Sequence, residues 1–302
     1  MGKANKKLPF MVLLIFSVFS VSVKATDIYS CTEINQPGYY KLADNIFAEE
    51  SECLYINGVD GVIIDGNNKF IYGRIDVERL IYVHHSRNVL IKNIVLDTAI
   101  SGLEIDYSYW TYFENSKIIN TEEALTGDYS YGITVKNSMV SVADTCVELQ
   151  TTSYSYFLNN VLSDCEIEGV FLFDVKESTF YGNFISSNEY LLAVENCSRL
   201  SIYNNYFMSY SPYPYDVSVM RTYNSEWNVP MQIGRAITGG PFIAGNFWGN
   251  YRGKGVSQMC SDLNPVDGLC DTANKVLGKG NVDRKPLAVW RPEMKIITGI
   301  VS

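Results

Sequence analysis

The sequence is poor in positive charge, in histidine and in long apolar runs. Its 24 lysines and arginines are outnumbered by 33 aspartates and glutamates, and the net charge at pH 7 is −9. An acidic surface repels phosphate, so nucleic acid is not an expected partner. After residue 25, no stretch approaches the roughly 20 apolar residues that a membrane-spanning helix needs. These shortages disfavour nucleic-acid binding and, for the mature chain, a transmembrane segment.

The middle of the chain also lacks the apolar period of 3.6 residues that a helical or leucine-rich repeat would show. A 22-residue register takes its place. Six rows superimpose, with one step of 23 residues between the fourth and fifth; they begin at Leu80, Gly102, Ala124, Cys146, Gly169 and Leu191. The fourteenth column reads Asn93, Asn115, Asn137, Asn159, Gly182 and Asn204. A fixed period in the twenties predicts a solenoid of stacked coils.

Apolar residues alternate with polar ones in three short stretches of each row, which is the pattern of β-strands. The first row carries Ile81 and Val83, then Val89 and Ile91, then Leu96. The prediction is an all-β fold: a single-stranded right-handed parallel β-helix with three sheets, about 22 residues per coil and a cap at each end. The asparagine column marks a tight left-handed turn. We expect its side chains to hydrogen-bond from coil to coil, about 4.8 Å apart, and assign them no chemistry.

The repeat also divides the chain into segments. An earlier coil fits if it begins at Cys53, with Gly66 in the asparagine column and a five-residue excursion near residues 73–78. The register fades after Pro212 and recovers once at Gly245-Asn246-Phe247. The predicted segments are a signal peptide (1–25), an N-terminal cap (26–52), the β-helix (53–250, with an irregular coil or loop at 213–240) and a C-terminal cap and tail (251–302).

The first 25 residues have the pattern of a secretory signal peptide. Three lysines precede an apolar run from Leu8 to Val23, and Val23-Lys24-Ala25 approximates a small-x-small cleavage site. An uncleaved anchor is the alternative, because Val23 and Lys24 depart from the ideal site. Cleavage removes four lysines and no acid, so the net charge changes from −9 to −13. The expected location is outside the cell or on its surface.

Seven cysteines in an exported chain predict disulfides with one thiol left over. Cys31 and Cys53 bracket the N-terminal cap, and Cys260 and Cys270 bracket a short loop near the C-terminus. A third candidate pair, Cys146 and Cys165, lies near the same corner of successive coils. The remaining Cys197 stands in a column of small residues, which favours a buried free thiol.

Three segments carry a resemblance to a known family: residues 31–73, the asparagine-bearing coils, and residues 227–287 with the motifs ITGGPFIAGNFWGNY, CSDLNPVDGLCD and VDRKPL. They resemble the NosD-like right-handed β-helix proteins of the pectate-lyase-like class, which are common among archaeal surface proteins. The resemblance covers nearly the whole mature chain, and the C-terminal motifs are its specific part. It implies export, a cell-envelope setting and contact with carbohydrate, but no particular reaction.

The outward columns of the first sheet carry the candidate catalytic residues. If columns two and four point inward, columns three and five place four carboxylates on one outward patch: Glu104, Asp106, Asp128 and Glu148. Carboxylates one coil apart raise the pKa of one member, as a general acid requires, and the spacing suits a retaining glycosidase. A polysaccharide hydrolase or calcium-assisted lyase is one interpretation. A solvated acidic face is preferred, because the nearest columns supply only Arg87 and Lys176 as bases.

Aromatic residues flank these acids. The segment Asp-Tyr-Ser-Tyr occurs at residues 106–109 and 128–131, which places Tyr107 over Tyr129 and Tyr109 over Tyr131. Flat rings beside carboxylates suit the faces and hydroxyls of sugars. Stacked tyrosines also stabilise sheets, so a structural role is an equal alternative. The candidate ligand-binding residues are Tyr82, Tyr107, Tyr109, Trp110, Tyr129 and Tyr131.

Two metal sites come into question. An Asp-rich loop resembles calcium-binding loops through Asp262, Asn264, Asp267 and Asp271, but it lacks the EF-type spacing and the terminal glutamate. Structural calcium is therefore the one candidate cofactor, with turn formation as the alternative. The pair His84-His85 would be the copper ligands. Copper is not expected, because adjacent strand residues face opposite ways and no other histidine exists.

The sequence thus predicts a secreted or cell-surface β-helix that binds polysaccharide or neighbouring cell-envelope proteins. The rival prediction is a polysaccharide hydrolase or lyase centred on Asp106 and Asp128. The short apolar tail, residues 294–302, could add a strand to a partner.

Overall fold

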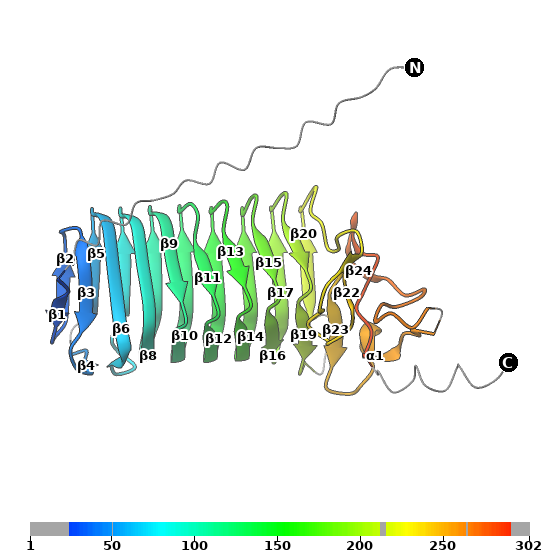
Figure 1. Ribbon diagram of the computed structural model, residues 1–302, viewed down its shortest axis with the longest axis horizontal. Coiled ribbons are helices and arrows are strands. Elements are labelled where there is room, and N and C mark those ends of the chain that lie inside the picture. The colour runs from blue at the N-terminus through cyan, green and yellow to red at the C-terminus, as the bar shows by residue number, and fades with distance from the viewer. Residues whose placement is uncertain (1–23, 50, 212–215, 264, 291–302) are drawn as a thin grey trace, which may run out of the picture.

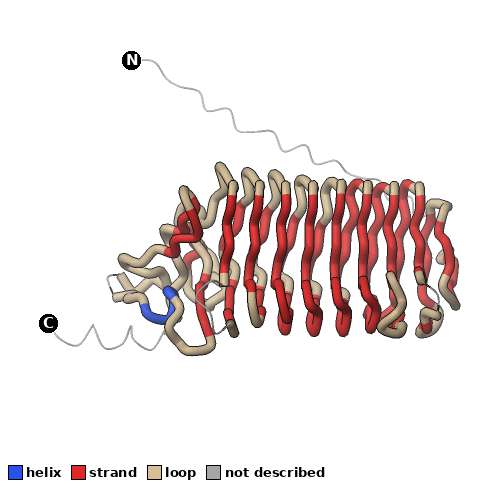
Figure 2. Tube along the Cα trace, turned by 180° about the vertical axis from the view of Figure 1, so that it is seen from behind, coloured by secondary structure: helices blue, strands red, loops and turns tan. Residues whose placement is uncertain are grey.

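The computed structural model describes residues 24–49, 51–211, 216–263 and 265–290. Its strands stack side by side into one elongated body, with the first coil at one end and the C-terminal cap at the other (Figure 1). Strands joined by short turns form the coils, and a short helix lies in the C-terminal cap (Figure 2). The predicted parallel β-helix is confirmed. Most of the predicted signal peptide and the whole tail 294–302 lie outside the described residues.

The main sheet contains 21 strands that pair in parallel. The N-terminal strands are β1 (Thr26–Ile28), β2 (Thr32–Ile34), β3 (Gly38–Leu42) and β4 (Ile46–Phe47). The central strands are β5 (Glu52–Asn57), β6 (Asp60–Tyr72), β7 (Arg79–His84), β8 (Arg87–Asp106), β9 (Tyr109–Glu114), β10 (Lys117–Asp128), β11 (Thr134–Lys136), β12 (Met139–Gln150), β13 (Tyr156–Leu158) and β14 (Val161–Phe173). The last are β15 (Thr179–Tyr181), β16 (Phe184–Ser187), β17 (Tyr190–Glu195), β18 (Ser201–Tyr203), β19 (Tyr206–Ser209), β20 (Val217–Met220) and β23 (Phe247–Asn250).

The 22-residue register is the pairing register of the strands. Leu103 pairs with Leu125 and Leu125 with Val147, each 22 residues further along the chain. The single 23-residue step also has a place: Ala143 pairs with Cys165, but Thr145 pairs with Glu168. The extra residue therefore lies between Cys165 and Glu168. Inward columns fill the interior, where the seventeenth column is buried throughout: Leu96, Ile118, Val140, Leu162, Ile185 and Phe207.

The five-residue excursion of the early coil was placed wrongly in part. The offset between paired residues falls in two steps, from 27 to 25 to 22, as three pairs show: Asp65 with Lys92, Lys69 with Ile94, and Arg79 with Ser101. Two extra residues therefore lie between Asp65 and Lys69, and only three lie near residues 73–78. The left-handed turn is made by Asn67 and Asn68, with φ of 51° and 58°, and not by Gly66.

The asparagine column has the predicted backbone but not the predicted hydrogen bonds. Its six residues all have φ between 50° and 70°. The coil-to-coil ladder lies one column later, where the Nδ2 atoms of Asn160, Asn183 and Asn205 donate to the next Oδ1 at 3.1, 2.9 and 3.0 Å. This later column turns inward and is buried, so its amides have no water to bond. In the fourteenth column, Asn115, Asn137 and Asn159 are exposed, whereas Asn204 is buried.

Parallel pairing begins before Cys53, the predicted start of the coils. Strand β2 pairs with β5, and Thr32 lies opposite Leu54 at the usual distance of 22 residues. The structure has the three disulfides suggested by the sequence, Cys31–Cys53, Cys146–Cys165 and Cys260–Cys270, and Cys197 is a buried free thiol. Such bonds form in oxidising compartments outside the cytosol.

The C-terminal cap covers the last coil. It contains two antiparallel pairs and one short helix: β21 (Gln232–Ile233) with β22 (Phe242–Ile243), β24 (Lys275–Gly278) with β25 (Asn281–Asp283), and α1 (Val256–Met259). Buried Trp227 donates from Nε1 to Asn281 Oδ1 at 3.0 Å. The predicted return of the register is confirmed, because Phe247 pairs with Tyr206. In the part of the chain that the structure describes, no helix is long and apolar enough to cross a membrane.

Candidate functional site

The four predicted carboxylates lie together on the outward face of the first sheet. Strands β8, β10 and β12 run side by side there, so Glu104 pairs with Thr126 and Thr126 with Glu148, while Asp106 pairs with Asp128. They line a shallow depression of about 260 Å³, which we call the carboxylate depression. Its lining residues are Glu104, Asp106, Glu123, Thr126, Gly127, Asp128, Glu148 and Gln150. Glu123 is the carboxylate that the sequence analysis missed.

Asp106 is the carboxyl group with the most perturbed protonation. Burial, followed by the negative charge of Glu104, raises its pKa to about 7. The Tyr82 hydroxyl donates to Asp106 Oδ2 at 3.2 Å, which opposes that rise. Burial also raises the pKa of Asp128 and Glu123. The depression therefore holds one carboxyl group, Asp106, whose pKa lies near neutral pH.

A basic residue does lie beside the acids, contrary to the sequence analysis. Arg79 donates from Nε to Glu104 at 2.6 Å and from Nη1 to Glu52 at 2.8 Å. Its guanidinium also lies 4.6 Å from the centre of the Tyr82 ring. Arg79 stands one position before Leu80, where the first row begins, and so lies outside the third and fifth columns that predicted the carboxylates. Strand pairing places Arg79 opposite Ser101, and Ser101 opposite Glu123, so the same 22-residue count would have found it.

The predicted aromatic residues gather at the turn that follows the carboxylates. Tyr107 stacks on Tyr129 with ring centres 5.1 Å apart and planes within 5°. Trp110 packs edge-on against Tyr131 at 5.0 Å, and Tyr109 lies 6.2 Å from Tyr131. We call these five residues the aromatic corner. Tyr82 lies apart from it, on the sheet face, where it stacks on Tyr55 at 5.3 Å.

The aromatic corner combines exposure with an unfavourable backbone. Tyr107, Trp110 and Tyr129 are 46%, 40% and 54% exposed, and their φ angles are 49°, 59° and 45°. Bulky residues rarely adopt the left-handed region, and each such position costs of order 1–3 kcal/mol. Asparagine or glycine would form the same turn more easily, as they do at the fourteenth column. Turn formation alone therefore does not account for these side chains.

The rings of His84 and His85 lie side by side. The expectation that the two side chains face opposite ways, which was an argument against copper, is therefore wrong. Strand β7 ends at His84, and His85 has a φ of 47°, which turns its ring back to 4.0 Å from the ring of His84. A further copper ligand is still needed. The Nδ1 atom of His84 faces the Tyr55 hydroxyl at 3.2 Å. Among the described residues, no group of three or more His, Cys, Asp or Glu could hold a metal ion. These residues do not fit a resident copper site.

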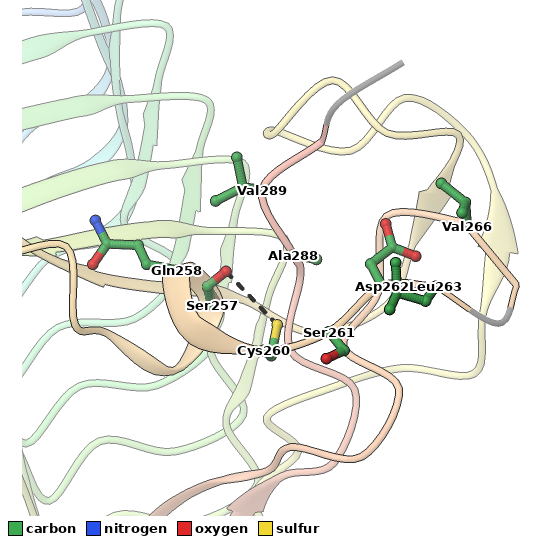
Figure 3. Close-up of a pocket in the computed structure, with 9 residues that line it drawn as sticks. All are labelled: Ser257, Gln258, Cys260, Ser261, Asp262, Leu263, Val266, Ala288 and Val289. Carbon is green, nitrogen blue, oxygen red and sulfur yellow. Dashed lines mark hydrogen bonds between the residues drawn. The ribbon is translucent and has the colours of Figure 1, made fainter. Parts of the chain in front are cut away.

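The predicted calcium loop lies in the C-terminal cap, far along the chain from the carboxylate depression. Its aspartates bond to backbone groups: Asp262 accepts from the N–H of Asp267 and Gly268 at 2.8 and 2.9 Å, and Asp271 accepts from Leu263 at 2.9 Å. Asp262 and Leu263 also border a cavity of about 260 Å³ beside Cys260 (Figure 3). Asn264 lies outside the described residues. Calcium binding stays a prediction.

The stacked coils define a parallel β-helix protein, and its three disulfides indicate a compartment outside the cytosol. A family model described as periplasmic copper-binding protein (NosD) matches residues 28–253. The chain therefore belongs to the NosD family. Among curated proteins, none matches the chain in sequence.

Several solved structures share the fold. The A-module of the mannuronan C-5 epimerase AlgE6 from Azotobacter vinelandii is 11% identical over 66% of this chain and 60% of that chain, with a TM-score of 0.43. Full-length tailspike protein 2 from an Escherichia coli O157:H7 bacteriophage is 11% identical over 68% of this chain and 33% of the tailspike chain, with a TM-score of 0.48. The DFA-IIIase from Arthrobacter chlorophenolicus A6, in complex with GF2, is 10% identical over 63% of this chain and 62% of the DFA-IIIase chain, with a TM-score of 0.45. This chain spans less than two thirds of each of those chains.

Proposed function

We propose that this protein binds polysaccharide outside the cytosol through the aromatic corner and the adjoining carboxylate depression. The observation that carries the proposal is the aromatic corner itself. Three of its rings, Tyr107, Trp110 and Tyr129, are exposed and held on a backbone that a simple turn would avoid, and the rings of Tyr107 and Tyr129 are parallel from coil to coil. Exposed rings offer flat apolar faces to the C–H groups of a sugar. The carboxylates and the Gln150 amide beside them can accept and donate hydrogen bonds to hydroxyl groups.

The arrangement suits an extended ligand better than a small enclosed one. Tyr107 and Tyr129 follow Asp106 and Asp128 directly in the sequence, so each coil presents one ring beside one carboxylate. Successive coils repeat the pair at the strand spacing of about 4.8 Å. A linear polysaccharide along the long axis would meet this pair of groups on two successive coils. Its cell-envelope setting would also place neighbouring envelope proteins within reach, as the sequence predicts.

Replacing both Tyr107 and Tyr129 by alanine should weaken retention on immobilised polysaccharide about ten-fold or more, since each lost ring removes stacking area. Affinity electrophoresis of the purified chain through gels that contain neutral or charged polysaccharides measures this. Tyr29, which is exposed on the first coil and away from the corner, provides the matched control Tyr29→Ala. Undiminished retention of the double variant would show that the aromatic corner is not the binding surface.

A polysaccharide-cleaving enzyme is the second candidate, because Asp106 has a raised pKa and Arg79 supplies a basic residue beside the acids. A carboxyl group with a pKa of about 7 can act as a general acid at neutral pH. If Asp106 acts in this way, release of reducing ends or unsaturated products should fall as the pH rises above about 7, because the acid loses its proton. Asp106→Asn should abolish the release. A screen for these products from pH 5 to about 9 tests the enzymatic function. If no substrate yields a product, the protein is not a polysaccharide-cleaving enzyme of this kind.

Copper takes no part in the proposed function. The description of the family model mentions copper, but the described residues of this chain offer two imidazoles without a third suitable ligand. We therefore do not propose a copper-binding role for this chain.

A further inference from the structure

We propose that this protein is a glycoprotein in which the side-chain amide of Asn196 carries an N-linked oligosaccharide. The acceptor is the triplet Asn196-Cys197-Ser198, which has the Asn-x-Ser/Thr pattern of N-glycosylation with a middle residue other than proline. It is the one triplet of this kind in the sequence, although asparagine is frequent in the turns of the coils. The inference concerns a covalent modification and does not depend on polysaccharide binding.

The folded chain leaves room for a sugar at this position. The disulfides place the chain outside the cytosol, in the compartments where N-glycosylated proteins are found. Asn196 directly follows β17 and is exposed on the surface. The structure gives its side-chain amide no hydrogen bond to any described residue. An oligosaccharide on Nδ2 therefore extends into solvent and breaks no hydrogen bond of the fold.

The stack holds the triplet through its main chain and its middle residue. The backbone N–H of Asn196 donates to the Met220 carbonyl at 3.1 Å, and that of Ser198 donates to the Val175 carbonyl at 3.1 Å. Cys197 between them is buried, 1% exposed. Because these contacts fix the backbone on both neighbouring coils, we expect the sugar to be attached to the exported chain before this coil closes.

The turn accounts for Asn196 but not for Ser198. Asn196 has a φ of 56°, a left-handed conformation that asparagine tolerates well. The column of Ser198 has no such requirement, since residues of very different size and charge pair along it: Arg87, Tyr109, Tyr131, Ser153, Lys176, Ser198 and Tyr223. Neither packing nor the turn therefore demands a hydroxyl group two positions after the asparagine, whereas N-glycosylation does.

The modification joins the amide nitrogen to the first sugar. Nδ2 of Asn196 forms a bond to the anomeric carbon of an oligosaccharide that is linked through phosphate to a lipid. The bond between that carbon and the phosphate oxygen breaks, and the lipid phosphate leaves with the electron pair. The amide gives up one proton to a basic group of the transferase, and nothing is oxidised or reduced. The transferase and the lipid-linked donor are supplied by the cell.

Asn196 shares a column with two residues of the aromatic corner. It occupies the sixth position of its row, as Tyr107 and Tyr129 do in theirs. Three coils separate Asn196 from Tyr129, or about 14 Å at about 4.8 Å per coil. The first sugar therefore stands on the same edge of the solenoid as the aromatic corner, beside it and not over it. Glycosylation and polysaccharide binding can thus be measured separately.

Mass spectrometry of the full chain, purified from the cells that naturally make it, tests the proposal. Trypsin releases residues 177–199, which also contain Asn188. Asn188 is the internal control, because it is exposed but has no serine or threonine two positions later. We expect this peptide to be heavier than its sequence by a whole oligosaccharide, and fragmentation to place the sugar on Asn196. Absence of any heavier form, or a sugar on Asn188, would overturn the proposal.

Two variants expressed in the same cells separate recognition of the triplet from damage to the fold. Ser198→Ala removes the hydroxyl group and should leave the peptide entirely without sugar, although Asn196 is retained. Ser198→Thr preserves the pattern and should keep the oligosaccharide. A sugar that persists in Ser198→Ala, or is lost in Ser198→Thr, would contradict N-glycosylation at this triplet.

Discussion

Replacement of Asp283 by alanine is expected to lower the free energy of unfolding by about 2 to 5 kcal/mol, because buried hydrogen-bond donors lose their acceptor. This carboxyl group is fully buried where the C-terminal cap meets the last coil. Its Oδ2 accepts from the Asn246 backbone at 2.8 Å and from Trp248 Nε1 at 2.9 Å, and its Oδ1 accepts from the Lys285 backbone at 3.1 Å. Alanine leaves the donors of two buried residues, Asn246 and Trp248, without an acceptor.

Urea denaturation followed by tryptophan fluorescence measures this loss, because Trp227 and Trp248 are both buried near the cap. Asp27→Ala provides the control, since Asp27 is exposed on β1 and should change stability by less than about 0.5 kcal/mol. A loss below about 1 kcal/mol for the Asp283 variant would mean that the hydrogen bonds of this residue do not hold the cap in place.

Replacement of Asn183 by alanine should cost a similar amount, about 2 to 4 kcal/mol, by interrupting the buried asparagine ladder. Asn183 Oδ1 accepts from the Asn160 backbone at 2.9 Å. Its Nδ2 donates to the Phe157 carbonyl at 2.8 Å and to Asn205 Oδ1 at 2.9 Å. Removal therefore leaves groups on the coils above and below without partners, and adds a cavity.

The matched control lies in the neighbouring column. Asn159→Gly changes an exposed turn asparagine into the residue that the chain already uses at the equivalent Gly182, so the thermal midpoint should hardly change. Thermal melts by circular dichroism compare the two. If Asn159→Gly destabilises as much as Asn183→Ala, the turn backbone and not the ladder is what holds the coils in register.

The period of the sequence was enough to predict the coils, because each inward residue recurs at the same place in every row. The period also predicted which outward residues share a column, including Glu104 with Glu148, two coils apart, and Tyr107 with Tyr129, one coil apart. The same count did not show which of two adjacent asparagine columns turns inward, since that depends on one φ angle at the corner. For the same reason His85 turned out to lie beside His84, where strand alternation predicted opposite faces.

Two further features of the structure, the position of Arg79 and the two turns of the early coil, could not be predicted from the rows of the repeat. Arg79 belongs to the outward face but stands just ahead of the first row, so the candidate site lacked its guanidinium. The excursion of the early coil had the right total length, yet its residues are shared between two turns, which a single offset cannot reveal. The sequence predicted a raised pKa for one carboxyl group from charge repulsion, but the raised pKa of Asp106 comes first from burial, which the sequence does not show, and then from Glu104.

A solenoid can unravel from its ends, because each coil is held only by its neighbours. Cys31 and Cys53 are separated by 22 residues, the length of one coil, and so their bond closes the first coil into a covalent ring. At the opposite end, Cys260–Cys270 closes a loop of the cap. Strands β2 to β4 lie inside the first ring and cannot peel away as a free end while the Cys31–Cys53 bond persists, although β1 lies outside it. Outside the cell, where proteases cut frayed segments, such closed ends preserve the coils between them, and reducing agents would expose those ends to digestion first.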